Sequence, residues 1–121
     1  MVISLDGRRT TSFPAFVDEM NRALAPVLNE PWNGTLDALA DLLNDFDGRL
    51  VWTHVDAARD ALGYAAMTDW LETRVDFVHP TNRPDILARL VEARHGHGPT
   101  LFEMLYGLMS AVLGKRLVLE A

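Results

Sequence analysis

The chain has 121 residues, of which 49% are hydrophobic and 23% are charged, and its formal net charge is −6. This composition is typical of a single globular domain, and a chain of this length buries enough surface to fold without a metal or a disulfide. The absence of cysteine excludes disulfides, thiolate catalysis and cysteine-ligated metals. The negative charge argues against direct binding of nucleic acid, which needs clustered Lys and Arg, and favours a basic partner.

The first residues, MVISLDGRRTTS, do not have the order of a secretory signal peptide, because the two arginines follow the short apolar run instead of preceding it. No window of the sequence approaches the ~20 apolar residues that a membrane-spanning helix needs. We therefore expect a cytoplasmic protein with no membrane partner.

A strand and a helix are predicted first along the chain. Val2–Leu5 is a short β-prone run, and the Asp6-Gly7 dipeptide after it favours a turn. Ser12 is placed to cap a helix whose apolar residues recur at helical spacing as far as Leu24. Pro26 is expected to end this helix or to follow close behind its end, since a proline inside a helix removes a hydrogen bond.

A second helix is predicted after the loop Asn29–Gly34. Thr35 is its expected N-cap, and Gly48 is expected to stop it. Four apolar side chains recur at helical spacing along one of its faces: Leu36, Leu39, Leu43 and Phe46. This stripe predicts which side of the helix is buried.

A second strand is predicted over Arg49–Val55. Its nearly continuous apolar character predicts burial on both faces, with His54 as a hydrogen-bonded core residue. Asp56 is then expected to cap a short helix that runs to Leu62.

The remainder of the chain is predicted to be mainly helical. Residues 64–99 include one or two turns around Trp70 and a helix that starts near Thr81 and ends at His95. The expected buried face of that helix consists of Leu87, Leu90 and Val91. Residues 101–113 form the most apolar helix, and a last strand covers residues 117–119.

This order of elements predicts the fold class. Strands alternate with helices, which favours an α/β fold with a small parallel sheet of three strands, packed helices and right-handed crossovers. We expect one domain over residues 1–121.

The negative charge is concentrated in one segment. Residues 29–48 contain no Lys, Arg or His and five acids: Glu30, Asp37, Asp41, Asp45 and Asp47. Three of these aspartates recur every fourth residue, so they project from one side of the predicted helix, away from its apolar stripe. Like charges at this spacing destabilise a helix by roughly 0.2–0.5 kcal/mol per pair. Either a cationic partner relieves this repulsion, or the aspartates form a solvated face that serves only solubility.

The same segment resembles the barstar family, the intracellular inhibitors of secreted bacterial ribonucleases. The resemblance rests on Glu30, Trp32 and the run Leu36-Asp37-Ala38-Leu39-x-Asp41-x-Leu43. The predicted elements before and after this run resemble the strands and helices of the family in order and spacing. The resemblance implies a barstar-like domain in which residues 64–99 are an inserted helical segment before the last helix.

The resemblance also implies a protein-binding surface on the second helix and the loop before it. In the family this surface blocks the ribonuclease active site, with carboxylates in place of substrate phosphates. Asp41 corresponds to the central aspartate of the family and Asp37 to a second one, a turn earlier. The implied contact residues are Trp32, Asn33, Thr35, Asp37, Ala40, Asp41, Asn44 and Asp45. For Trp32, packing against the core is an equally good interpretation.

Two departures from the family pattern support an alternative. Ala40 occupies the position of a large aromatic contact residue, and residues 64–99 are an insertion relative to the family. The alternative is therefore a barstar-like interaction or immunity module directed at a different toxin or cellular protein.

The sequence does not indicate an enzyme. His95 and His97 lie in a Gly-rich loop without an obvious third metal ligand, and no phosphate-binding loop or nucleophile motif is present. A metal-assisted hydrolase that uses these two histidines is the remaining enzymatic hypothesis. We expect no catalytic, cofactor-binding or metal-binding residue, no small-molecule substrate, and a basic ribonuclease or similar cationic protein as partner.

Overall fold

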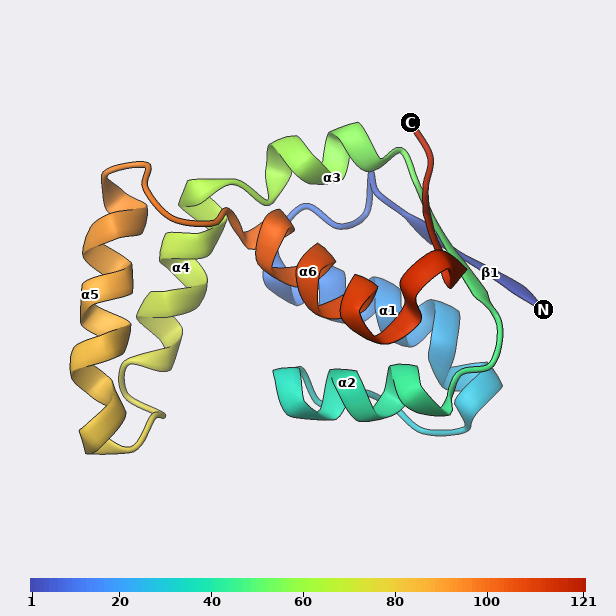
Figure 1. Ribbon diagram of the computed structural model, residues 1–121, viewed down its shortest axis with the longest axis horizontal. Coiled ribbons are helices and arrows are strands. Elements are labelled where there is room, and N and C mark those ends of the chain that lie inside the picture. The colour runs from blue at the N-terminus through green and yellow to red at the C-terminus, as the bar shows by residue number, and fades with distance from the viewer.

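The computed structural model describes all 121 residues and contains three strands and six α-helices (Figure 1). The strands form one parallel sheet in the order β1-β2-β3: β1 (Val2–Asp6), β2 (Arg49–Thr53) and β3 (Leu117–Leu119). In its register, Ile3 lies opposite Leu50, which lies opposite Leu117 on the other side. The predicted α/β class and the three-stranded parallel sheet are confirmed.

The helices fall into two groups in Figure 1. Three lie beside the sheet: α1 (Phe13–Leu28), α2 (Leu36–Asp45) and α6 (Leu101–Leu113). Two form an antiparallel hairpin at the end of the molecule farthest from the sheet: α4 (Tyr64–Arg74) and α5 (Arg83–Arg94). Three short helices complete the fold: α3 (Val55–Ala61) and the 3-10 helices η1 (Pro80–Asn82) and η2 (Gly114–Arg116).

One hydrophobic core extends through both groups of helices. Trp52 of β2 is fully buried at its centre, with ring centroids 5.6 Å from Phe16 of α1 and 5.1 Å from Phe102 of α6. On the opposite face of β2, Arg49 is exposed and Val51 is only half-buried. The expectation that β2 is buried on both faces is therefore wrong, because only one face of the sheet is fully covered.

Helix α1 begins as predicted and ends later. The Ser12 hydroxyl accepts a hydrogen bond from the Ala15 amide (3.2 Å), which confirms the N-cap. Pro26 lies inside the last turn, so the expectation that it ends the helix is wrong. The helix continues to Leu28, which packs against the core, and Asn29 closes it in the left-handed region (φ 56°). Core packing near the end of the helix compensates the single hydrogen bond that the proline removes.

The chain leaves β2 earlier than expected. His54 is exposed in the left-handed region (φ 48°) and precedes α3, so the prediction of a core histidine is wrong. The first turn of the chain packs against this point, and a Cβ at Gly7 would collide with the carbonyls of Thr53 and His54, so only glycine permits the close approach. Asp56 lies in the first turn of α3 and pairs with Arg59 (3.0 Å) instead of capping the helix.

The end of α2 also differs from the prediction. Phe46 is its C-cap in an extended conformation, and Gly48 lies beyond the end of the helix. A Cβ at Gly48 would lie 2.8 Å from the Met1 carbonyl oxygen, so this glycine serves the pairing of β2 with β1. Arg116 donates hydrogen bonds to the carbonyls of Phe46 (2.5 Å) and Gly48 (3.2 Å), which closes this end of the helix.

The hairpin is more regular than the sequence indicates. The predicted turns around Trp70 belong to a helix of 11 residues, whereas the predicted helix ending at His95 is confirmed. Its buried face consists of Ile86, Leu90 and Ala93. Leu87 and Val91, which were expected on that face, are 44% and 54% exposed. The apolar residues of α5 occupy more than one face, and packing against α4 decides which face is buried.

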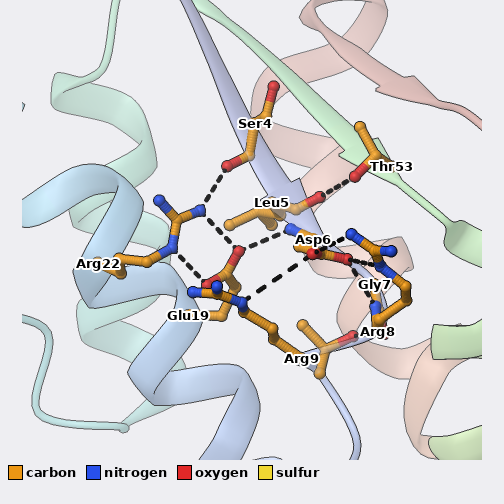
Figure 2. A network of polar contacts seen from close by, with 10 residues as sticks. Ser4, Leu5, Asp6, Gly7, Arg8, Arg9, Glu19, Arg22 and Thr53 are labelled. Carbon is orange, nitrogen blue, oxygen red and sulfur yellow. Dashed lines mark hydrogen bonds and ion pairs between the residues drawn. The ribbon is translucent and has the colours of Figure 1, made fainter.

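The free edge of β1 is covered by side chains of α1 (Figure 2). The Asp6 amide donates to Glu19 (2.6 Å), and Arg22 donates to the Ser4 carbonyl (3.1 Å). Arg22 also forms two hydrogen bonds with Glu19, at 2.6 and 2.7 Å. These side chains satisfy backbone groups that a further strand would otherwise pair with, which protects the edge from association.

The carboxyls of this edge are stabilised in their charged forms. Hydrogen bonds from the Arg8 side chain and amide lower the pKa of Asp6 from 3.8 to about 2. Burial opposes the charge of Glu19, but hydrogen bonds from Arg22 and the Asp6 amide outweigh it and lower the pKa of this carboxyl. Sequence reasoning did not identify Glu19, which is only 3% exposed.

Candidate protein-binding surface

Helix α2 presents three aspartates to solvent, Asp37, Asp41 and Asp45, which we call the acidic ridge. The opposite face of the helix is buried, contacts α6 and consists of Leu39, Leu42 and Leu43. This packing fixes the direction in which the ridge points, because residues four apart lie one above another on a helix. The predicted exposure of the three aspartates agrees with the structure. Of the predicted apolar stripe, Leu39, Leu43 and Phe46 are buried, whereas Leu36 is only half-buried.

The N-terminal end of α2 is fixed by the loop before it. The Thr35 hydroxyl accepts from the Ala38 amide (3.4 Å), so the predicted N-cap is confirmed. The Asn33 side-chain oxygen accepts from the Thr35 amide (3.0 Å) and from its hydroxyl (2.9 Å). Asn33 and Thr35 are both exposed, so they order the loop while remaining accessible to a partner.

The ridge carboxylates have no cationic partner within the protein. All five ion pairs of the structure involve carboxylates elsewhere: those of Asp6, Glu19, Asp56 and Glu72. Glu30 and Asp47, the other acids of residues 29–48, also form no ion pair. The repulsion along α2 is therefore not relieved by the fold.

Loop and helix acids meet at a shallow pocket of ≈ 180 Å³. Glu30 lines it from the loop, and Asp41 and Asp45 line it from α2, together with Asn33. The loop thereby adds a fourth carboxylate, that of Glu30, to the charge of the ridge. Of the remaining predicted contacts, Asn44 is exposed with no hydrogen bond from its side chain, and Ala40 is half-buried.

Trp32 does not lie on this surface. It is 4% exposed, and its ring packs edge-on against Phe13 (6.1 Å) and Phe16 (5.8 Å). Its indole N–H donates to the Thr35 carbonyl (2.7 Å), and its amide donates to Asn21 (2.6 Å). The prediction of Trp32 as a contact residue is therefore wrong, and the core interpretation holds. Burying the large aromatic ring in the core stabilises the fold, whereas exposing it on the surface would not.

A second hollow of ≈ 320 Å³ adjoins the N-terminal end of the ridge. Thr35, Leu36 and Asp37 line one side, and Arg74, Phe77 and Val78 of the α4–α5 turn line the other. Figure 1 shows this turn at the same end of the molecule as the start of α2. Sequence reasoning did not place Phe77 near the ridge, because no local pattern relates residues so far apart along the chain.

The histidine loop is separate from the ridge. The His95 ring nitrogen Nδ1 lies 2.8 Å from the Val91 carbonyl oxygen, so it is engaged with its own helix. The structure has no group of three or more His, Asp or Glu side chains placed to hold a metal ion. None of the helices has both the length and the apolar character needed to cross a bilayer.

Comparisons with known proteins identify no relative of this chain. A scan against protein-family models and searches of curated proteins and of solved structures find no match for this chain. The function is therefore inferred from the sequence and from the geometry of the surface.

Proposed function

We propose that the protein inhibits a basic ribonuclease by placing the acidic ridge and the preceding loop in the cationic active site of the enzyme. The observation that carries the proposal is a row of three exposed aspartates with no cation of the same chain to pair with. A ribonuclease is chosen among cationic partners because the run from Leu36 to Leu43 resembles the barstar family.

The chemistry of a ribonuclease active site suits this surface. Such a site presents Lys, Arg or His side chains to the phosphates of its substrate. Successive ridge carboxylates are about 6 Å apart along the helix axis, since each residue rises about 1.5 Å. Carboxylates at such intervals occupy the positions of backbone phosphates and accept charge-assisted hydrogen bonds from the same cations. Inhibition then requires no catalytic group on this protein.

The charge of the ridge also determines how the complex forms. An acidic surface and a basic cleft attract each other before contact, which raises the association rate. Salt screens this attraction, with a Debye length of about 10 Å at 0.1 M ionic strength. The inhibition constant should therefore rise as salt is added.

The proposal is tested by titrating a panel of small basic ribonucleases with the protein. We expect stoichiometric inhibition of at least one enzyme. Asp41→Ala should weaken binding by about 2–5 kcal/mol, because it leaves a buried cation of the enzyme unpaired. Asp18→Ala is the matched control, since Asp18 is an exposed aspartate of α1 with no ion pair. Equal effects of the two substitutions would contradict the proposal.

One observation favours the alternative target. The ridge itself carries no exposed aromatic side chain, because Trp32 is buried and position 40 is an alanine. A barstar-like interaction or immunity module directed at a different toxin or cellular protein would also bind its basic partner through the acidic ridge. It predicts that Asp41→Ala abolishes salt-sensitive binding to a basic protein that is not a ribonuclease, and that no enzyme of the panel is inhibited.

A further inference from the structure

We propose that Phe77, at the tip of the α4–α5 hairpin, is an apolar anchor for the same cationic partner that covers the acidic ridge. This inference rests on the proposed function and extends the docking surface onto the hairpin. The partner is expected to have a cationic cleft with an exposed apolar side chain at its rim.

The exposure of Phe77 has no explanation within the chain. Its side chain is 88% exposed, and no other aromatic residue of the protein exceeds 37% among the exposed hydrophobic residues. Exposed aromatic rings of this kind are characteristic of binding surfaces, where they bury large area at little cost in conformational entropy.

The turn that carries Phe77 is held by hydrogen bonds. The amides of Phe77 and Val78 both donate to the Arg74 carbonyl, at 3.0 and 3.1 Å. Arg83 at the start of α5 donates to the Val75 carbonyl (3.3 Å), which ties the two helices together across the turn. The ring is therefore presented on an ordered backbone, and a partner would not have to order the turn on binding.

Phe77 and the ridge share a surface. The hollow of ≈ 320 Å³ is lined by Phe77 on one side and by Asp37 on the other, so a partner seated on Asp37 also reaches Phe77. Because Phe77 and the acidic ridge border the same hollow, we assign them to one partner. Leu87 and Val91, also exposed on the hairpin, do not line this hollow.

The charges around the hollow determine what enters it. Arg74 lines it together with Asp37, and the two side chains form no ion pair. The Arg74 guanidinium lies over the Trp70 ring, 4.7 Å from its centroid, which holds the positive charge at this place. Within the hollow the charges of Arg74 and Asp37 oppose each other, so a cation of the partner gains less there than beside Asp41 and Asp45. The hollow therefore suits an apolar side chain next to the cations that Asp41 and Asp45 receive.

The test uses the full chain and the ribonuclease of the panel that it inhibits most strongly. Phe77→Ala is compared with Val91→Ala, a truncation of another exposed apolar residue of the hairpin, 54% exposed. We expect Phe77→Ala to raise Kd at least tenfold and Val91→Ala to leave it within twofold. The slope of log Kd against log salt should stay unchanged in Phe77→Ala, since no charge is removed, and should become shallower in Asp41→Ala. Phe77→Trp should restore binding, because it retains an aromatic anchor.

Each other outcome has a definite meaning. If Phe77→Ala binds like Val91→Ala while Asp41→Ala is weakened, the inference about Phe77 is wrong and the proposed function stands. If no ribonuclease is bound, both are overturned. If sedimentation shows that the free chain is a dimer and that Phe77→Ala is a monomer, the ring belongs to a contact between copies of this chain, which also overturns the inference. Thermal unfolding of each variant checks that this exposed substitution leaves the fold intact.

Discussion

At the free edge of β1, Asp6 and Glu19 each lie against an arginine, whereas the aspartates of the acidic ridge on α2 face solvent with no cation of the chain beside them. Both regions carry carboxylates: Asp6 and Glu19 at the strand edge, and three aspartates along α2. In the first, the arginines lower the pKa of both carboxyls, and Glu19 and Arg22 complete the hydrogen bonding of the strand edge. In the second, the carboxylates form no ion pair within the protein. The number of acids in a segment therefore does not reveal its role, whereas the position of the arginines does.

The largest effect that this comparison predicts is on stability, at the paired region. Glu19→Ala should lower the free energy of unfolding by about 2–3 kcal/mol, because the Asp6 amide loses its acceptor and Arg22 loses its partner. Urea denaturation measures this change. Asp18→Ala, at the neighbouring exposed position, should lie within about 0.5 kcal/mol of the parent chain. Ribonuclease inhibition per folded molecule should stay the same in Glu19→Ala. A loss of inhibition without a loss of stability would reverse the roles that we assign to the two regions.

A second effect is the dependence of stability on pH. The pKa of Asp6 is about 2 in the folded protein against an ordinary value of 3.8, and that of Glu19 lies below its ordinary 4.5. As the pH falls, the unfolded chain takes up these protons before the folded protein does, so the stabilisation present above about pH 4.5 is lost towards pH 2. Urea midpoints measured at intervals between pH 7 and pH 2.5 should follow this decline.

The variant Asp6→Asn sharpens this pH test. It removes one of the two titrating groups, so its stability should fall less steeply between pH 4.5 and pH 2.5 than that of the parent chain. Asp41→Asn is the control on the ridge, because Asp41 has no ion pair within the protein, and its decline should match that of the parent. Identical curves for all three proteins would show that the Asp6–Arg8 contact does not contribute to stability.

Sequence patterns predicted the features that depend on neighbouring residues. The caps at Ser12 and Thr35, the apolar helix of residues 101–113 and the exposure of the ridge all follow from spacing along a single helix. The three short strands were also found, because each is an apolar run bounded by turn residues. Their pairing in a parallel sheet followed from the helices between them.

Features that depend on distant residues were not predicted. His54 lies against Gly7 of the first turn of the chain, and this contact joins residues far apart in the sequence. The buried face of α5 was misassigned because Leu87 and Ile86 are equally apolar, and only contact with α4 distinguishes them. Trp32 is buried because Phe13 and Phe16 receive its ring, and the position of Phe77 beside the ridge depends on how the hairpin folds back. None of these relations leaves a signal in the local sequence.

The smallest predicted effect separates stability from binding on the ridge itself. Asp45 repels Asp41 one turn earlier and lies in the last turn of α2, where a negative charge opposes the helix dipole. Asp45→Asn should therefore raise the free energy of unfolding by about 0.5–1 kcal/mol, the sum of these two small terms.

The same substitution removes a carboxylate from the proposed interface, so the inhibition constant should rise. Opposite changes in the urea midpoint and in ribonuclease inhibition are the expected signature of a surface kept for binding at the expense of stability. Asp18→Asn on α1 should change neither quantity. If Asp45→Asn stabilises the protein and leaves inhibition unchanged, this end of the ridge is a solvated helix face and the docking surface stops at Asp41.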